Sequence, residues 1–357
     1  MNSTECVVHK ELGFDNELYL QLQKDAILER LSHFPQGTLY LEIGGHFLTD
    51  PHAQRVLPGF EVSVKPEIIK ALGIPFEIIF CANAQDIAKN RMLSNRNGTY
   101  VETVVALIRE YQATFHVPIA VAINLVEKIT PQITTFRSQL AYQNIPTYLR
   151  YVINGYPEPS LVVSEQGYGK DEYIPTESQL VLVIGPASNS GKLSTCLGQI
   201  YHDITQGKDS GYAKLELFPI WNYPLKHPVN LAYEAATADI GDYNLVDPLH
   251  FQAHHVEAIN YNRDVEAFPI ISKLLGKMVA ATNYLHTYKS PTDMGINRAG
   301  FAITDSNIVA QASYEEILRR IDWFDQQVQE GRGKEKWVKR CKELAQEAKK
   351  YLANPSI

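Results

Sequence analysis

The stretch LVLVIGPASNSGKLST, residues 180–195, decides the fold class of this 357-residue chain. Residues 180–184 form an unbroken apolar run, which is typical of a strand buried on both faces of a sheet. Small residues and glycines follow, and the apolar spacing over residues 192–206 predicts a helix. A buried strand, a tight turn and a helix are the unit from which parallel α/β sheets are built.

The turn in this unit has the composition of a phosphate-binding loop. Backbone N–H groups at a helix N-terminus are unpaired, and the helix dipole favours an anion beside them. Small residues let the backbone approach phosphates closely, and a lysine supplies positive charge. We therefore expect a phosphorylated ligand, such as ATP or a related nucleotide, to contact Gly185, Ser188, Asn189, Ser190, Gly191, Lys192, Ser194 and Thr195.

The loop departs from the standard pattern in two ways. Five residues separate Gly185 from Gly191, whereas the usual spacing is about four. Leu193 also follows the lysine directly, where Ser or Thr would bind Mg²⁺. Ser194, Thr195 or Asp247 could hold Mg²⁺ instead. The alternative interpretation is a tight strand-to-helix turn with Lys192 in solvent.

Similar apolar runs and helical patterns extend on both sides of this stretch. They predict an α/β fold with two mainly parallel-sheet units, Rossmann-like and the second with the P-loop-like turn, followed by C-terminal helices. The expected strands are residues 38–43, 76–81, 118–126, 147–153, 161–163, 180–184 and 213–218. The expected helices are residues 16–33, 99–115, 132–144 and 192–206.

Composition changes along the chain predict three domains. Prolines, glycines and charges gather in residues 154–179, so we expect an N-terminal α/β domain over residues 1–155 and a P-loop-like α/β domain with long polar loops over residues 156–312. The chain looks irregular from about Pro219 to Asp305. Residues 313–357 are expected to form a helical segment, in which Ser313 and Glu316 make a capping box. These amphipathic helices suit a homo-oligomer interface or an intramolecular cap.

Residues 211–264 are dense in side chains that could meet a ligand. Lysine and arginine can bind phosphate or carboxylate, acidic residues can hold Mg²⁺, and asparagine can orient a polar substrate. The alternative for each single residue is a capping or loop-stabilising role. We expect catalytic roles for Lys192, Lys226, His227, Asp239 and Arg263, and substrate contacts from Lys214, Glu216, Trp221, Asn222, Asn230, Glu234 and Asn262.

A pair of histidines in the same part of the chain raises the question of a metal. His250 and His254 are four residues apart, so on a helix they share one face, as in zinc hydrolases. The His-Glu-x-x-His motif is absent, however, because Phe251 follows His250. The motif therefore does not support a metalloprotease, and no nucleophile-elbow or catalytic cysteine signature takes its place.

The composition of the chain indicates which partners to expect and in which cellular compartment the protein is found. Hydrophobic residues make up 45% of the chain and charged residues 20%, which is a globular balance, and the formal net charge of −7 argues against a nucleic-acid binder. The sequence shows no signal peptide, and the apolar run at residues 117–126 is about half of a membrane-spanning helix. Four widely spaced cysteines fit reduced thiols. We expect a cytoplasmic protein with no membrane or nucleic-acid partner.

At these motifs the sequence resembles a bacterial family, domain-of-unknown-function family 1846, from about Gly13 to Ala312. The resemblance implies little chemistry: some members are labelled ATP-dependent peptidases, and no catalytic constellation here supports that label. It also implies a further C-terminal α/β domain, whereas this sequence ends in two charged helices. The motifs that carry the resemblance are residues 13–17, 55–60, 165–170, 190–192, 195–197, 218–222, 225–239, 260–266 and 289–295.

Three functions are consistent with these patterns. The first is an ATP-dependent enzyme of ligase or kinase type that acts on a small anionic metabolite. The second is a regulatory protein that binds a nucleotide or metabolite without turnover. The third is a transferase that acts on a sugar phosphate. Turnover separates the first from the second, and a requirement for a nucleoside triphosphate separates the first from the third.

Overall fold

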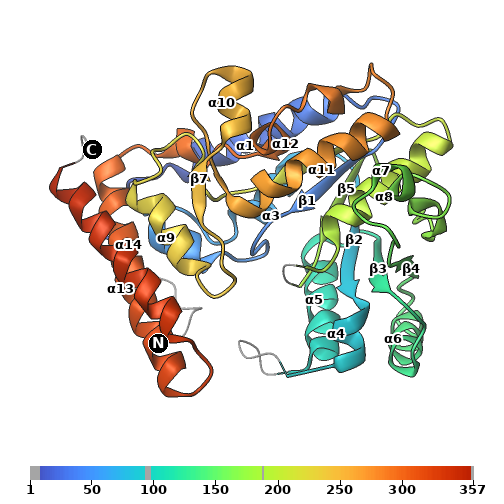
Figure 1. Ribbon diagram of the computed structural model, residues 1–357, viewed down its shortest axis with the longest axis horizontal. Coiled ribbons are helices and arrows are strands. Elements are labelled where there is room, and N and C mark those ends of the chain that lie inside the picture. The colour runs from blue at the N-terminus through green and yellow to red at the C-terminus, as the bar shows by residue number, and fades with distance from the viewer. Residues whose placement is uncertain (1–8, 93–97, 187–188, 355–357) are drawn as a thin grey trace.

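The computed structural model describes residues 9–92, 98–186 and 189–354. Its main feature is a sheet whose strands are flanked by helices on both faces (Figure 1). The strands are Leu39–Ile43 (β1), Phe76–Asn83 (β2), Ile119–Val126 (β3), Thr147–Tyr151 (β4), Leu180–Ile184 (β5), Gly211–Leu215 (β6), Asn244–Val246 (β7), Ile259–Tyr261 (β8) and Gly295–Ile296 (β9).

The helices occupy most of the remaining chain. The α-helices are Asn16–Ser32 (α1), Pro51–Val56 (α2), Val64–Ala71 (α3), Ala84–Lys89 (α4), Tyr100–Phe115 (α5), Pro131–Ala141 (α6), Pro159–Val162 (α7), Lys192–Thr205 (α8), Pro228–Ala236 (α9), Pro248–His254 (α10), Asn262–Met278 (α11), Pro291–Met294 (α12), Ser306–Gln329 (α13) and Glu335–Ala353 (α14). Short 3₁₀ turns are Tyr168–Lys170 (η1), Tyr284–Thr287 (η2) and Ala299–Ala302 (η3).

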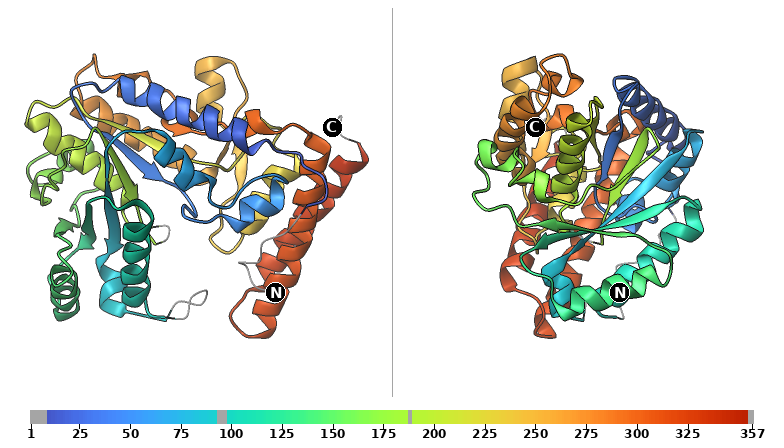
Figure 2. Two further views of the ribbon diagram at one scale, coloured as in Figure 1. Left: turned by 180° about the vertical axis from the view of Figure 1, so that it is seen from behind. Right: turned by 90° about the vertical axis from the view of Figure 1, so that its right-hand side faces the viewer.

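Seven strands form one sheet in the order β4-β3-β2-β5-β1-β6-β9, and every pairing in it is parallel. β7 and β8 make a separate antiparallel hairpin. The β5 strand is buried at every position, as its unbroken apolar run predicts. Helices α1 and α3 lie on one face of the sheet and α8 on the other, as the front and back views show (Figure 2).

The α/β class is confirmed, but the expectation of two separate sheet units is wrong. β5 pairs with β2 on one side and with β1 on the other, so strands from both expected units share one sheet. In this position both hydrogen-bonding edges of β5 are paired, each with a strand formed earlier in the chain. The domain boundaries expected near residues 155 and 312 stay predictions.

Two local predictions also fail. Residues 161–163 were expected to form a strand, but Pro159 begins the short helix α7, whose first turn is capped by the Glu158 side chain. The irregular stretch after Pro219 contains the 17-residue helix α11, although Pro269 lies inside it. Burial of apolar residues on one face of α11 outweighs the unfavourable effect of the proline on the helix.

The capping box expected at Ser313 and Glu316 is wrong, because both residues lie inside α13. This helix begins earlier, at Ser306, where the Asp305 side chain accepts hydrogen bonds from the first-turn amides. Ser313 Oγ instead donates to the carbonyl of Val56 at 3.3 Å. The predicted break at Gly331 and Gly333 is confirmed, since α13 ends at Gln329 and α14 begins at Glu335.

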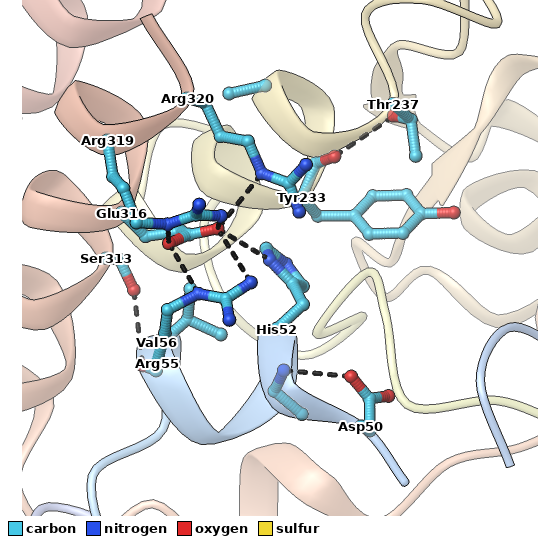
Figure 3. A network of polar contacts seen from close by, with 12 residues as sticks. Asp50, His52, Arg55, Val56, Tyr233, Thr237, Ser313, Glu316, Arg319 and Arg320 are labelled. Carbon is cyan, nitrogen blue, oxygen red and sulfur yellow. Dashed lines mark hydrogen bonds and ion pairs between the residues drawn. The ribbon is translucent and has the colours of Figure 1, made fainter. Parts of the chain in front are cut away.

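Glu316 is the centre of a buried ion cluster that ties α13 to α2 (Figure 3). Its carboxylate lies 2.8 Å from Arg55 Nε, 2.6 Å from Arg319 Nε, 3.0 Å from Arg320 Nε and 3.2 Å from His52 Nδ1. Burial alone raises the pKa of this carboxyl, but hydrogen bonds from Arg319 and His52 and the charge of Arg320 outweigh burial and place the pKa well below its usual range. Glu316 is therefore a permanent anion that joins the N-terminal part of the chain to the C-terminal helix pair.

Candidate functional site

The loop after β5 lies where the strand order of the sheet reverses. β2, β3 and β4 follow one another outward in one direction, whereas β5 lies on the other side of β2. In open α/β sheets, ligands bind outside the carboxyl ends of the strands at such a switch point. The predicted phosphate loop therefore occupies the position on the sheet where this architecture makes room for a ligand.

Two asparagines at the ends of neighbouring strands hold this loop in place. Asn83 Nδ2 donates to the carbonyl of Asn189 at 3.1 Å, and Asn124 Nδ2 donates to the carbonyl of Ser190 at 2.9 Å. Both asparagine side chains are largely buried. Because the sheet binds these two carbonyls, the backbone of residues 189 and 190 has a fixed orientation before any ligand arrives.

The two glycines of the loop are required by its geometry. Gly191 has a φ of +86°, and a Cβ there would lie 2.7 Å from the Asn124 side chain. A Cβ at Gly185 would lie 2.2 Å from the buried hydroxyl of Ser190. A side chain at either position would displace the loop from the ends of β2 and β3.

Helix α8 begins at Lys192 directly after Gly191, and no side chain caps it. Among the described residues, none accepts a hydrogen bond from the backbone N–H groups of Lys192, Leu193 or Ser194. The Lys192 side chain is half-buried, and Asn189 is exposed with a φ of 62°. Ser188, which was also expected to contact the ligand, lies outside the described residues. The start of α8 thus offers unpaired amides and one lysine to an anion.

The expected Mg²⁺ ligands do not gather at this loop. Thr195 is fully buried, and its hydroxyl donates to Asn124 Oδ1 at 3.1 Å and to the Gly191 carbonyl at 2.9 Å. Ser194 is exposed on the first turn of α8. Asp247 is buried at the start of α10, where it accepts hydrogen bonds from two amides and from Thr292 Oγ1. Of the three, only Ser194 has an exposed side chain beside the loop.

A second polar cluster lies further along the same edge of the sheet, at the end of β6. Lys214 Nζ lies 2.8 Å from Glu216 Oε1 and 2.5 Å from Asp264 Oδ2, and it donates to the hydroxyl of Tyr261. That hydroxyl in turn donates to Glu216 Oε1 at 3.2 Å. Only β1 separates β5 from β6. The spacing of parallel strands therefore places this cluster about 10 Å from the loop along the edge.

Glu216 is the group in this cluster with the most unusual protonation. Burial raises its pKa to about 7; the Lys214 charge opposes this rise, and the Asp264 charge adds to it. The pKa of Lys214 is raised well above its usual value, since the two carboxylates and the nearby Glu42 outweigh its burial. The carboxyl groups of Glu216 and Asp264 therefore share the single ammonium of Lys214, and the Glu216 carboxyl can hold a proton near neutral pH.

Glu216 also lines a pocket of about 370 Å³ beside the edge of the sheet. Trp221 forms another part of the wall, and its indole Nε1 donates to the carbonyl of Asn297 at 2.9 Å. Asn222 does not line this pocket, and its buried Oδ1 has no partner among the described residues. The pocket is large enough for a small metabolite.

Several residues predicted to be catalytic have structural partners elsewhere. Lys226 is exposed and pairs with Glu347 of α14. His227 is fully buried: its Nδ1 accepts from the amide of Val229, and its Nε2 lies 3.0 Å from Ser306 Oγ. Burial lowers the pKa of His227 to about 4, so its imidazole is neutral at physiological pH. These contacts join α9 to the C-terminal helices.

Most of the remaining predicted residues make structural contacts, and one is exposed on the surface. Asn230 binds backbone groups of residues 220–224, and Glu234 pairs with Arg340 and accepts from the amide of Asn244 at 3.1 Å. Asn262 Oδ1 accepts from the amide of Tyr243, and Arg263 pairs with Asp242 at 2.6 Å. Asp239 is exposed. Of the predicted set, Lys214 and Glu216 lie together at the edge of the sheet.

Sequence reasoning missed two residues that shape the loop. Asn124 lies near the end of an apolar strand. A polar asparagine that interrupts an apolar run is the signal in the sequence that could have indicated a buried hydrogen-bonding role. Arg150 is 2% exposed; its guanidinium lies 3.0 Å from Asp171 and 3.4 Å from the carbonyl of Ser194 in the first turn of α8. Arg150 lies within the strand expected at residues 147–153, and nothing in the neighbouring sequence indicates that its side chain contacts residue 194.

Helices of the described chain do not combine the length and apolarity needed to cross a lipid bilayer. Cys81, Cys196 and Cys341 are free and buried. Burial raises the pKa of the Cys81 thiol to about 11, so it is not a reactive thiolate.

Comparison with known proteins identifies relatives that are named UPF0371 proteins. The chain is 44% identical over 314 residues to a UPF0371 protein of Streptococcus sanguinis, a match that covers 87% of this chain and 62% of the relative. It is 43% identical over 311 residues to the UPF0371 protein FN1121 of Fusobacterium nucleatum, covering 87% and 60%. A UPF0371 protein of Clostridium tetani is 42% identical over the same length. The chain thus spans about 60% of the length of these curated relatives.

A family model described as "Domain of unknown function DUF1846, N-terminal" matches residues 12–349. This match extends beyond the region of resemblance found in the sequence and includes most of α14. The two C-terminal helices therefore belong to the matched domain. The chain belongs to the DUF1846 family and corresponds to its N-terminal domain.

Proposed function

We propose that this chain binds a phosphorylated ligand, most simply a nucleotide, with its phosphates on the loop from Gly185 to Lys192 and on the first turn of α8. The observation that carries the proposal is the loop at the strand-order switch point, held by Asn83 and Asn124 and followed by amides that have no acceptor among residues 9–92, 98–186 and 189–354. The anchored backbone of residues 189 and 190, with a helix dipole behind it, stabilises an anion without reorganising when the ligand binds.

The second part of the proposal is that the bound nucleotide serves an ATP-dependent reaction on a small anionic metabolite. Lys214 and Glu216 lie along the same edge, about 10 Å from the loop by strand spacing, which is within the span of a triphosphate with an acceptor. In phosphoryl transfer, positioning and neutralisation of charge supply most of the catalysis. Glu216, with a pKa near 7, has the protonation equilibrium that a general acid or base requires.

One observation favours a non-catalytic binder as the second candidate. Leu193 follows the lysine, and the Thr195 hydroxyl is engaged with Asn124, so the usual side-chain ligand for Mg²⁺ is missing. A nucleotide could then bind and regulate without turnover. The transferase hypothesis for a sugar phosphate uses the same loop without a triphosphate.

The test is calorimetric titration of the purified chain with ATP, ADP and a non-hydrolysable ATP analogue, with and without Mg²⁺. We expect saturable binding that Lys192→Ala weakens by about tenfold or more, since a charge-assisted phosphate contact contributes about 1.5–3 kcal/mol. Lys339→Ala is the matched control, because Lys339 is exposed on α14 and lies outside the loop. Equal binding by the wild type and Lys192→Ala, or no binding by the folded wild type, would overturn the nucleotide proposal.

A turnover measurement separates the candidates that share the loop. If nucleotide binds, ATP consumption is followed in the presence of pools of small carboxylic and phosphorylated metabolites. Consumption that Glu216→Gln reduces supports the enzyme. Binding without consumption favours the regulatory protein, and turnover of a sugar phosphate without triphosphate favours the transferase.

A further inference from the structure

Three side chains from two helices form one cluster beside the pocket. His250 and His254 project from the same face of α10, and Asp293 lies in the short helix α12. A ligand atom from each residue lies within 4.8 Å of the others. The sequence places the two histidines one helical turn apart, but only the packing of α10 against α12 adds the carboxylate.

The separations between these atoms match those around a bound transition metal. His254 Nε2 lies 3.1 Å from Asp293 Oδ1, and His250 Nδ1 lies 3.7 Å from the same oxygen. Metal–ligand bonds near 2.0–2.1 Å in a tetrahedral site put neighbouring ligand atoms about 3.3 Å apart. The cluster therefore needs only small side-chain rotations to surround an ion.

The carboxylate and the helix that carries the two histidines are held by contacts outside the cluster. Asp293 Oδ2 accepts from the amides of Lys289 at 2.8 Å and Ser290 at 3.0 Å, in the capping box of α12. His250 Nδ1, the nitrogen that faces Asp293, also lies 2.9 Å from Ser290 Oγ, and a bound ion would replace this contact. Asp247 caps the helix that carries both histidines. Such supporting contacts are what hold metal ligands in position in known sites.

The cluster has a buried side and an open side. The His250 side chain is 11% exposed and Asp293 is 19% exposed, whereas His254 is 39% exposed. All three line the 370 Å³ pocket that Glu216 also lines, and His254 lines an adjoining hollow as well. An ion here would keep coordination positions toward the pocket, which is the arrangement of sites that bind water or a ligand oxygen.

We propose that His250, His254 and Asp293 bind one divalent transition-metal ion of the zinc class, with its remaining coordination directed into the pocket. Two imidazoles and one carboxylate are ligands that suit Zn²⁺ and its neighbours rather than Mg²⁺ or Ca²⁺. The site does not follow the metalloprotease motif, because Phe251 stands where that motif has its glutamate. The proposal is independent of nucleotide binding, since the phosphate loop lies at the end of β5.

The test is competition titration of the untagged, full chain with Zn²⁺ against a chromophoric chelator, with thermal unfolding as a second readout. We expect one ion per chain and a rise in unfolding temperature when zinc is added. His254→Ala and Asp293→Asn should each weaken zinc affinity by about tenfold or more, the loss typical even of supporting residues around a metal. Asp293→Asn retains an oxygen that can still cap α12, so its loss of affinity would not reflect unfolding.

The control is His255→Asn. His255 directly follows the cluster, is exposed, and has a φ of 55°, which asparagine tolerates. Its zinc affinity should stay within about twofold of the wild type, since surface changes away from the ligands have little effect. The proposal is overturned if the wild type shows no saturable zinc binding at micromolar concentrations, or if both cluster variants bind as the wild type does. His254 and Asp293 would then form only a hydrogen-bonded pair.

Discussion

Glu316 and Glu216 are both carboxyls in buried ion clusters, yet their protonation shifts in opposite directions. Glu316 faces Arg55, Arg319 and Arg320, and its pKa is held well below the usual range. Glu216 shares the single ammonium of Lys214 with Asp264, and its pKa is raised to about 7. Burial acts on both in the same direction, so the ratio of cations to carboxylates decides the outcome.

This difference distinguishes the Glu316 cluster, which has a structural role, from the Glu216 cluster, which is a candidate for catalysis. An excess of arginine around Glu316 fixes the contact between α2 and α13, and the carboxylate stays ionised at every physiological pH (Figure 3). An excess of carboxylate around Lys214 leaves Glu216 able to exchange a proton near neutral pH, and Glu216 faces a pocket. Groups with such perturbed pKa values, located in a pocket, are functional-site candidates.

The largest expected effect comes from neutralising the structural carboxyl. Glu316→Gln leaves the guanidinium groups of Arg55, Arg319 and Arg320 buried without their anion, so we expect a loss of about 3–5 kcal/mol in the free energy of unfolding. Urea denaturation measures it, with Glu61→Gln on the exposed surface as the control. A loss below about 1 kcal/mol, the upper end of what a surface pair typically contributes, would contradict the view that Glu316 is a structural anion.

The same substitution at Glu216 should have a smaller effect that depends on pH. The folded pKa of about 7 lies above the unfolded value, so the folded state holds a proton that the unfolded state releases. The contribution of Glu216 to stability is fully present below the unfolded pKa and is lost as pH rises through 7. Relative to Glu216→Gln, the wild type should therefore lose on the order of 2–3 kcal/mol between pH 5 and pH 8.

Urea denaturation of both proteins across this pH range is the measurement. Curves of unfolding free energy against pH that run parallel would show that Glu216 keeps an ordinary pKa, and the contrast with Glu316 would fail. Glu61→Gln should run parallel to the wild type, because Glu61 is exposed.

The smallest effect is expected at Lys226, whose pair with Glu347 is on the surface. Exposed pairs contribute little because solvent screens them, so Lys226→Ala should change the unfolding free energy by less than about 0.5–1 kcal/mol. Thermal or urea denaturation checks this. A larger loss would mean that the contact between residue 226 and α14 stabilises the fold as a buried cluster does.

The sequence by itself determined the elements that depend on local pattern. The unbroken apolar run of β5 predicts a buried strand, and the small residues before Lys192 predict a tight turn into α8; both are observed. The break between α13 and α14 followed from Gly331 and Gly333. These features rest on side chains that are close in the chain, so their spacing contains the information.

Only the tertiary structure decided which of these elements meet. The insertion of β5 between β2 and β1 brings Asn83 and Asn124 to the loop, and packing of α12 on α10 brings Asp293 to His250 and His254. The Glu316 cluster joins residues about 260 positions apart, and local reasoning assigned that residue to a helix cap. Such contacts are selected by the burial of whole faces and the pairing of distant charges, which no local spacing records.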